Sequence, residues 1–282
     1  METTRRTFLA QSALAAAGFA SGFRQLQAAP LGMPIGTQVY PVRKAIGSDF
    51  EGTLRNLAKM GYRSIEMCSP VGYKGDFAAL AELKASELRQ RIRATGLNCE
   101  SSHYSFRELK DNLPETIEYA KGLGLTQMIL ASFGLRQGAT LDDWARAADE
   151  LNKVGEQALK AGMQIGFHNH DGEFTEIDGT LIYDKLMSVL DPKLVKMQYQ
   201  VSVGRLGFDA PTVFSKYPGR FLSLHLQDWS AADKRMVPIG KGAVDWPKLF
   251  AAARKAGVKN YFVEVDPEFM QDSIEFLKGL NV

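Results

Sequence analysis

From Pro34 almost to the C-terminus, short apolar segments alternate with segments in which apolar residues recur at helical spacing. The apolar segments predict strands at residues 35–40, 64–67, 97–102, 127–131, 163–168, 195–201, 221–226 and 261–265. The periodic segments predict helices at residues 50–59, 85–95, 114–123, 142–161, 181–190, 210–217 and 246–256. Strands that alternate with helices in this way form a parallel sheet, so the chain belongs to the α/β class.

The number of these units favours a sheet that closes on itself. A (β/α)8 barrel takes about 250 residues, which matches residues 31–282 once the N-terminal segment is set aside. An open sheet that binds a dinucleotide would carry Gly-x-Gly-x-x-Gly after its first strand. The first strand here is instead followed by Pro41-Val42-Arg43. We therefore predict a single-domain TIM barrel.

Residues 1–30 differ from the rest of the chain and predict an export signal. They contain Arg5-Arg6-Thr7-Phe8-Leu9, then an Ala-rich apolar run to about Phe23, then Ala28-Ala29-Pro30. The Arg pair before Phe and Leu resembles twin-arginine signals. The apolar run is too short and too rich in small residues to span a membrane. We expect a mature protein that is periplasmic or secreted, without a stable membrane anchor. The alternative is an amphipathic first helix of the mature fold.

Charge and cysteine content exclude further classes. The formal net charge of +2 argues against a nucleic-acid-binding protein, because such domains carry a concentrated basic face. The two cysteines, Cys68 and Cys99, each lie in an apolar segment. We therefore predict two buried thiols rather than a disulfide or a metal pair.

The four histidines of the chain indicate where the chemistry takes place. His103, His168, His170 and His225 all lie at the end of a predicted strand or just beyond it. In a TIM barrel the active site is built at this carboxyl-terminal face. A random distribution would have placed some of them on helices, so we expect them to meet in one site.

Carboxylates accompany the histidines. Glu264 lies between Val263 and Val265 in the last predicted strand, Glu66 ends the second strand, and Glu173 follows the histidines of the fifth. A carboxylate in an apolar strand is costly unless it binds a metal, pairs with a cation or transfers protons. Imidazoles and carboxylates together suit a divalent ion such as Mn²⁺, Zn²⁺ or Co²⁺.

Several segments resemble a known family, the xylose-isomerase-like barrels, also called sugar phosphate isomerases/epimerases. They are residues 166–174 (GFHNHDGEF), 217–220 (YPGR), 224–228 (LHLQD), 240–246 (GKGAVDW) and 262–264 (FVE). The resemblance runs from about residue 34 to the C-terminus and is most specific in the last third. It implies a divalent metal held by a strand-5 Glu, a strand-6 Asp, a strand-7 His and a strand-8 Glu. It also implies a sugar substrate and a proton shuttled by acidic residues through an enediolate.

The chain departs from this family pattern at half of the ligand positions. His225 and Glu264 match, but His168 replaces the strand-5 Glu and Gln200 replaces the strand-6 Asp. Gln227 stands where the family usually has Lys. A glutamine carbonyl binds transition metals more weakly than a carboxylate. The site therefore either holds a metal through these ligands or leaves the imidazoles as acid and base groups.

Together these features predict an isomerase, epimerase or lyase that removes a proton next to the carbonyl of a sugar or keto-sugar. The catalytic candidates are Glu264, His170 and Glu173, and the metal candidates are His168, Gln200, His225 and Glu264. The candidates for binding a carbohydrate substrate are Tyr40, Glu66, His103, Trp229 and Lys241. Arg205 and Lys241 suit a phosphate, or are solvated surface charges.

Two alternative functions belong to other classes. Gln200 and Gln227 leave open a non-catalytic sugar-binding barrel with a degraded metal site. A phosphodiesterase resembling the apurinic endonucleases needs three zinc ions and many more histidines than the chain has, so it is disfavoured. Assembly into a homo-oligomer stays possible.

Overall fold

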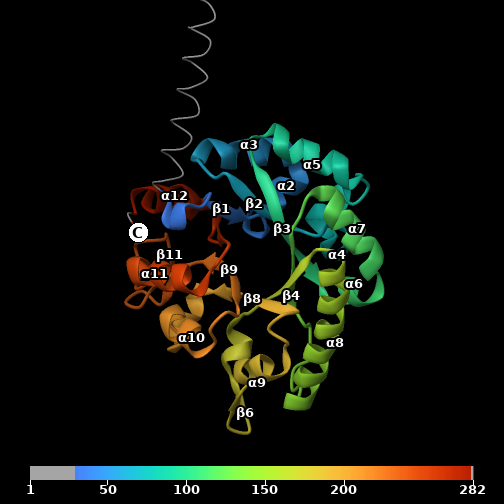
Figure 1. The fold of residues 1–282 in the computed structure, drawn as a ribbon. Helices are drawn as coiled ribbons and strands as arrows, with labels where there is room; N and C mark the ends of the chain where they lie inside the picture. The colour runs from blue at the N-terminus through green and yellow to red at the C-terminus, as the bar shows by residue number, and fades with distance from the viewer. Residues whose placement is uncertain (1–28, 281) are drawn as a thin grey trace, which may run out of the picture.

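A computed structural model describes residues 29–280 and 282, and in it the predicted strands close into one parallel barrel (Figure 1). Its strands, in order around the barrel, are β1 (Gly36–Gln38), β2 (Ser64–Cys68), β3 (Asn98–Ser105), β4 (Gln127–Ser132), β5 (Gln164–His168), β8 (Val195–Gln200), β9 (Phe221–Leu226) and β12 (Asn260–Val263). β12 pairs with β1 and completes the circle. The prediction of a single-domain TIM barrel is confirmed.

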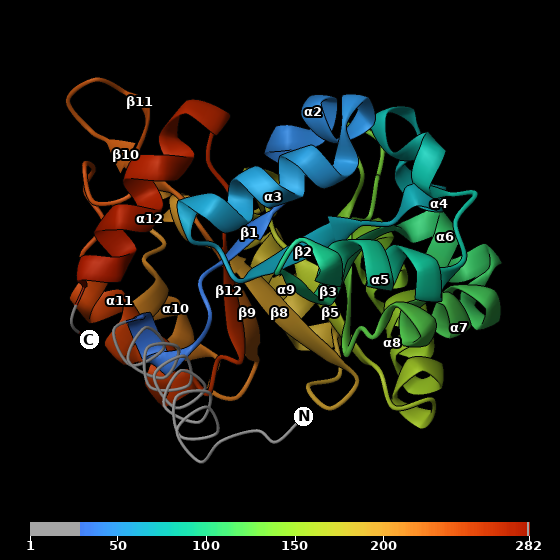
Figure 2. The ribbon, with the colours of Figure 1, turned by 90° about the horizontal axis from the view of Figure 1, so that it is seen from above.

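The helices surround the strands, as the view from above shows (Figure 2). They are α3 (Phe50–Met60), α5 (Ala85–Ala94), α7 (Leu113–Leu123), α8 (Leu141–Lys160), α9 (Ile182–Val189), α10 (Ala210–Lys216), α11 (Trp246–Ala256) and α12 (Met270–Gly279). All of them except α12 lie where the periodicity predicts a helix. α8 shows the cause most clearly, because it buries Leu151, Val154 and Ala158 along one face and begins at a Thr140 capping box.

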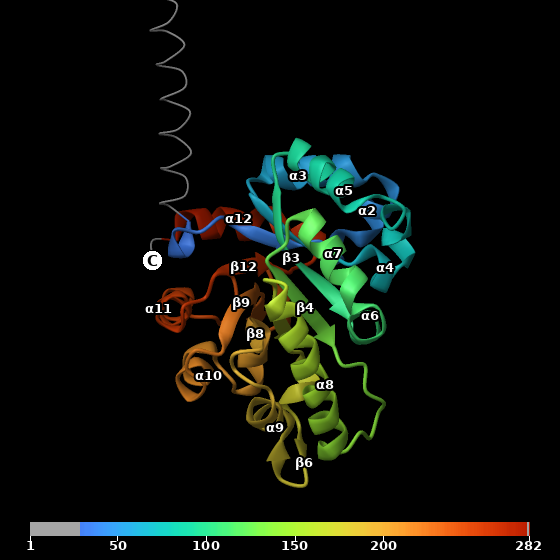
Figure 3. The ribbon, with the colours of Figure 1, turned by 45° about the vertical axis from the view of Figure 1, so that its right-hand side comes forward.

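Short helices and two hairpins lie in the loops between the barrel strands and the outer helices. After the barrel strands come α2 (Arg43–Ser48), α4 (Pro70–Tyr73), α6 (Phe106–Asp111) and short 3-10 helices. Two hairpins also lie outside the barrel, β6 (Glu176–Ile177) with β7 (Thr180–Leu181) and β10 (Asp228–Ser230) with β11 (Arg235–Val237). The first projects beside α9 (Figure 3). Asp178 and Gly179 form its two-residue turn with positive φ angles of 49° and 75°, the conformation that favours Asn or Asp followed by Gly.

The packed chain begins slightly earlier than predicted. The proposed signal falls mostly on residues 1–28, which lie outside the described residues. Ala29 and Pro30 are already buried against the barrel, and the hydroxyl of Tyr261 donates a 3.1 Å hydrogen bond to the carbonyl oxygen of Pro30. Within the described part of the chain, no helix has both the length and the apolar character needed to cross a membrane.

Both cysteines are free thiols: Cys68 is buried and Cys99 is half-buried. The prediction that they do not pair with each other is confirmed.

Candidate active site

A cavity of about 780 Å³ opens at the carboxyl-terminal end of the barrel. Its wall brings together predicted site residues from five strand ends: Tyr40, His103, His168, His170, Gln200 and Glu264. Tyr73, which was not predicted, adds a second aromatic ring 6.0 Å from that of Tyr40. The volume falls in the range of small-molecule sites.

Glu66 lies beneath this cavity rather than in its wall, fully buried inside the barrel. Each carboxylate oxygen accepts hydrogen bonds, and the donors come from the adjacent strands β1 and β3 and from β8 and β9 across the barrel. Oε1 accepts from Ser101 Oγ at 2.5 Å and Gln198 Nε2 at 2.8 Å. Oε2 accepts from Gln38 Nε2 at 2.8 Å, His225 Nε2 at 2.6 Å and His103 Nε2 at 3.1 Å. Burial alone would raise the pKa of Glu66, but the charges and hydrogen bonds of His103 and His225 hold it well below its usual range. Glu66, predicted to bind substrate, is therefore an ionised anchor for two imidazoles and lies outside the residues that line the cavity.

His225 connects this buried carboxylate to the cavity. Its Nε2 faces Glu66, and its Nδ1 lies 3.1 Å from Oε2 of Glu264. Burial alone would lower the pKa of His225, yet the charges of Glu264 and Glu66 raise it to about 10. The carboxylates of Glu66 and Glu264, which flank the ring, are both acceptors. Because Nδ1 faces an acceptor, a proton or another cation must lie between Nδ1 and Glu264.

Glu264 directly follows β12 and is the carboxylate that reaches the cavity. Its Oε2 accepts hydrogen bonds from Gln200 Nε2 at 2.8 Å and Gln227 Nε2 at 3.3 Å, in addition to the contact with His225. Burial opposes the charged form, but the charge and hydrogen bond of His225 lower the pKa of Glu264. Glu264 is therefore ionised at neutral pH.

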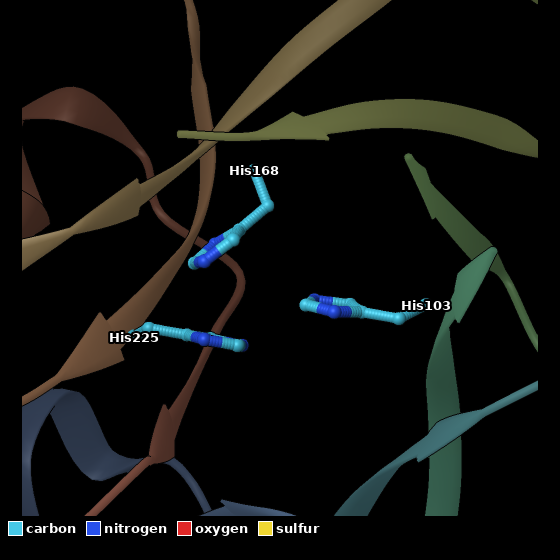
Figure 4. A group of neighbouring side chains, drawn as sticks. All are labelled: His103, His168 and His225. Carbon is cyan, nitrogen blue, oxygen red and sulfur yellow. The ribbon is translucent and has the colours of Figure 1, made fainter. Parts of the chain in front are cut away.

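Three buried imidazoles converge, one each from β3, β5 and β9 (Figure 4), and two of them, His103 and His168, line the cavity. Ligand nitrogens of His103, His168 and His225 lie within 4.8 Å of one another. His103 Nε2 faces two acceptors, Gln198 Oε1 at 2.7 Å and Glu66, so this nitrogen carries a hydrogen. Carboxylates that fix the hydrogen of one ring nitrogen commonly leave the other nitrogen free for a metal.

The residues present fit a divalent ion. Nδ1 of His168 and Oε1 of Gln200 are buried and have no hydrogen-bond partner within residues 29–280 and 282. Both atoms belong to predicted ligands, and a bound cation would satisfy them. Imidazoles with one carboxylate are a donor set that Zn²⁺, Mn²⁺ and Co²⁺ accept. His103 joins the four predicted metal ligands as a further candidate, because its ring lies close to those of His168 and His225. The sequence spacing did not indicate this proximity.

His170 lines the cavity and packs edge-on against His168, with ring centroids 4.7 Å apart. Burial lowers its pKa, so the ring is neutral at neutral pH and free to accept a proton. Glu173 lies behind it, buried, and its Oε2 accepts the His170 backbone N–H at 2.7 Å. The structure thus places the predicted catalytic Glu173 outside the cavity wall, where it holds the backbone of His170. Burial raises the pKa of Glu173 to about 7.

This raised pKa predicts a pH-dependent contribution to stability. The folded-state pKa lies above the ordinary value of 4.5, so protonated Glu173 stabilises the fold. That contribution, about 3 kcal/mol at most, is complete below pH 4.5 and is lost as the pH rises through about 7. Glu173→Gln mimics the protonated form, and we expect it to flatten the fall in urea-unfolding free energy between these pH values. An unchanged pH profile would contradict this assignment; Glu176→Gln, an exposed neighbour, is the matched control.

Two predicted substrate-binding residues lie elsewhere. Lys241 is exposed, on the loop between β11 and α11. The backbone amides beside it are already used, because Gly240 and Gly242 donate to the buried carboxylate of Asp228 at 2.9 and 3.1 Å. The loop therefore does not offer these amides to a phosphate. Trp229 lines a second, smaller cavity.

Sequence reasoning missed the buried polar layer around Glu66. Gln38, Ser101 and Gln198 hold that carboxylate in place and are themselves fully buried. The available signal was the presence of polar residues inside otherwise apolar strands.

The model of the xylose isomerase-like TIM barrel family matches residues 54–280, and the chain belongs to this family. An inosose dehydratase of Lacticaseibacillus casei is 30% identical over 152 residues, which are 45% of this chain and 49% of that protein. The chain thus spans about half the length of the curated relatives it matches.

Solved structures agree on the fold. A sugar phosphate isomerase/epimerase from Parabacteroides distasonis superposes with a TM-score of 0.70 at 26% identity, covering 87% of this chain and 93% of that one. The IOLI protein with a bound zinc atom has a TM-score of 0.65 at 14% identity, covering 87% and 95%. The second likeness shows the fold alone. The predicted family is confirmed, and the relatives are isomerase/epimerase-like enzymes and dehydratases.

Proposed function

We propose that the chain is an isomerase, epimerase or lyase that removes a proton from the carbon next to the carbonyl of a keto-sugar or a keto-cyclitol. The observation that carries this proposal is a neutral imidazole, His170, and an ionised carboxylate, Glu264, that line the same cavity. Such a reaction needs a neutral base beside an ionised carboxylate, and the different surroundings of the two groups keep them in these protonation states. The inosose dehydratase relatives support a substrate of this size and chemistry.

His170 is the proton acceptor in this scheme. Its ring is uncharged before the reaction, and the negative charge of Glu264 favours the imidazolium that forms when it takes the proton. Glu173 keeps the His170 backbone in place through its 2.7 Å hydrogen bond. Tyr40 and Tyr73 supply aromatic surface on which a sugar ring can pack.

The negative charge that develops on the substrate oxygen requires a cationic partner. A divalent ion held by His168, His225 and Glu264, with Gln200 or His103 completing the set, would polarise the carbonyl. Glu66 keeps Nε2 of His225 hydrogen-bonded, so that Nδ1 faces Glu264. We also propose export by the twin-arginine route and a periplasmic or secreted location, on the strength of the N-terminal Arg pair.

Metal content tests the ligand assignment without any assay of activity. We expect about one divalent ion per chain by elemental analysis of protein that folded before export, and loss of most of it in His225→Ala. His170→Ala, which changes another cavity imidazole, should retain the metal. Equal metal content in the wild type and His225→Ala would contradict the assignment.

The shared first step of the proposed reactions can be tested directly. Proton NMR in D2O should show exchange of the hydrogen next to the carbonyl in a panel of keto-sugars and inososes. The exchange should be lost in His170→Ala. A sugar that binds without any exchange would instead favour the non-catalytic sugar-binding barrel.

A further inference from the structure

A second cavity of about 300 Å³ lies beside the main one, between the loops that follow β8 and β9. More than half of the residues in its wall are apolar: Val201, Ala210, Pro211, Trp229, Ala231, Ala243, Val244 and Leu249. Ser202 and Arg205 border both cavities. The two cavities are therefore neighbours that share these two residues in their walls.

Arg205 is fixed at this boundary. Its Nη1 donates to the carbonyl oxygen of Ser202 at 2.9 Å, and its Nη2 pairs with Asp171 in the loop after β5. The guanidinium carbon also lies 5.5 Å from the centroid of the Trp229 ring. One side of Arg205 thus faces the cavity of His170 and Glu264, and the other faces the apolar cavity.

The charged groups in the wall of the smaller cavity offset one another, because the cations Arg205 and Lys248 accompany two carboxylates. Asp209 and Asp245 lie in its wall and cap the N-termini of α10 and α11, accepting from Thr212 N at 3.2 Å and Lys248 N at 3.0 Å. A phosphate would meet these two carboxylates, while the guanidinium of Arg205 is already paired with Asp171 and the amides of Thr212 and Lys248 are already bonded. An uncharged apolar group meets no such obstacle.

We propose that this cavity is a subsite for an aromatic substituent on a keto-sugar whose ring lies in the main cavity, which makes aryl glycosides of keto-sugars a substrate class of this protein. The inference rests on the proposed function for the position of the sugar ring. An apolar cavity of roughly 150 Å³ already accepts benzene, so the volume here is sufficient for one aromatic ring. Trp229 supplies a large flat surface against which that ring packs.

Equilibrium binding tests the subsite independently of turnover. Isothermal titration calorimetry with phenyl and methyl β-D-glucopyranoside should show about 10-fold or more tighter binding of the phenyl compound, because burying a ring of this size is favourable by that amount. Ala243→Phe, at an exposed loop position whose side chain lines the cavity, should abolish the preference. Ala251→Phe, exposed on α11 and outside both cavities, is the matched control and should keep it.

The outcomes separate this proposal from the proposed function. Equal affinity for the two glucosides, or no measurable binding of either, overturns the subsite. Proton exchange in keto-sugars without a phenyl preference would overturn the subsite and keep the function. A phenyl preference without exchange would keep the subsite and remove the function. If Ala243→Phe fails to fold, Trp229→Leu gives the same comparison, and an undiminished phenyl preference there contradicts the proposal.

Discussion

Glu264→Gln is expected to lower kcat/KM for a keto-sugar substrate by about 10³-fold. The substitution keeps the shape of the side chain and removes its charge. That charge stabilises the imidazolium of His170 as it forms. Glu264 is also the one carboxylate among the predicted metal ligands, and it lines the cavity. Glutamine also leaves Nδ1 of His225 without its anionic partner.

The experiment compares steady-state kinetics of the variant with those of Glu268→Gln. Glu268 is an exposed acid four residues away, outside the cavity wall, and its substitution should change kcat/KM by less than twofold. Circular dichroism of both variants checks that the barrel is folded. A loss of less than tenfold in Glu264→Gln would mean that the charge of Glu264 has no catalytic role.

Most of the fold could be predicted from the sequence because a barrel repeats one local pattern. Each buried parallel strand is a short apolar run, and each outer helix shows apolar residues at helical spacing. The prediction omitted α12, although Met270, Ile274 and Leu277 carry the same spacing. It also omitted the β6 and β7 hairpin, whose Asp178-Gly179 turn is a strong local signal.

The location of the site could be predicted from the sequence, but not which of its residues line the cavity and which lie buried beneath it. All four histidines do lie at or near the carboxyl-terminal face, because every parallel strand ends on that side. Whether a strand residue faces the cavity or the layer beneath it depends on the stagger between strands, which single-strand alternation does not contain. Glu66 and His225 lie in the lower layer for this reason. Trp229 is placed by the β10 and β11 hairpin, a tertiary feature outside the repeated pattern.

The buried position of Glu66 leads to the second large effect. Glu66→Gln is expected to lower the free energy of unfolding by about 3–5 kcal/mol, measured by urea denaturation at pH 7. Glutamine cannot accept from all the donors that surround the carboxylate, and its own amide hydrogens then face the N–H groups of His225 and His103. The imidazolium of His225 also loses one of two countercharges in a site without water access. Glu100→Gln, an exposed acid on the adjacent strand β3, should change stability by less than about 0.5 kcal/mol.

A double-mutant cycle shows whether the loss comes from the pair or from packing alone. His225→Gln removes the cation, so a second change at Glu66 no longer strands a buried charge. We therefore expect the double variant to be more stable than the sum of the single losses predicts, by about 1–3 kcal/mol. Strict additivity would mean that Glu66 and His225 act independently, despite the 2.6 Å between Oε2 and Nε2. It would also remove the structural reason for assigning Glu66 the role of holding His225 toward Glu264, because a carboxylate that does not interact energetically with the ring cannot orient it.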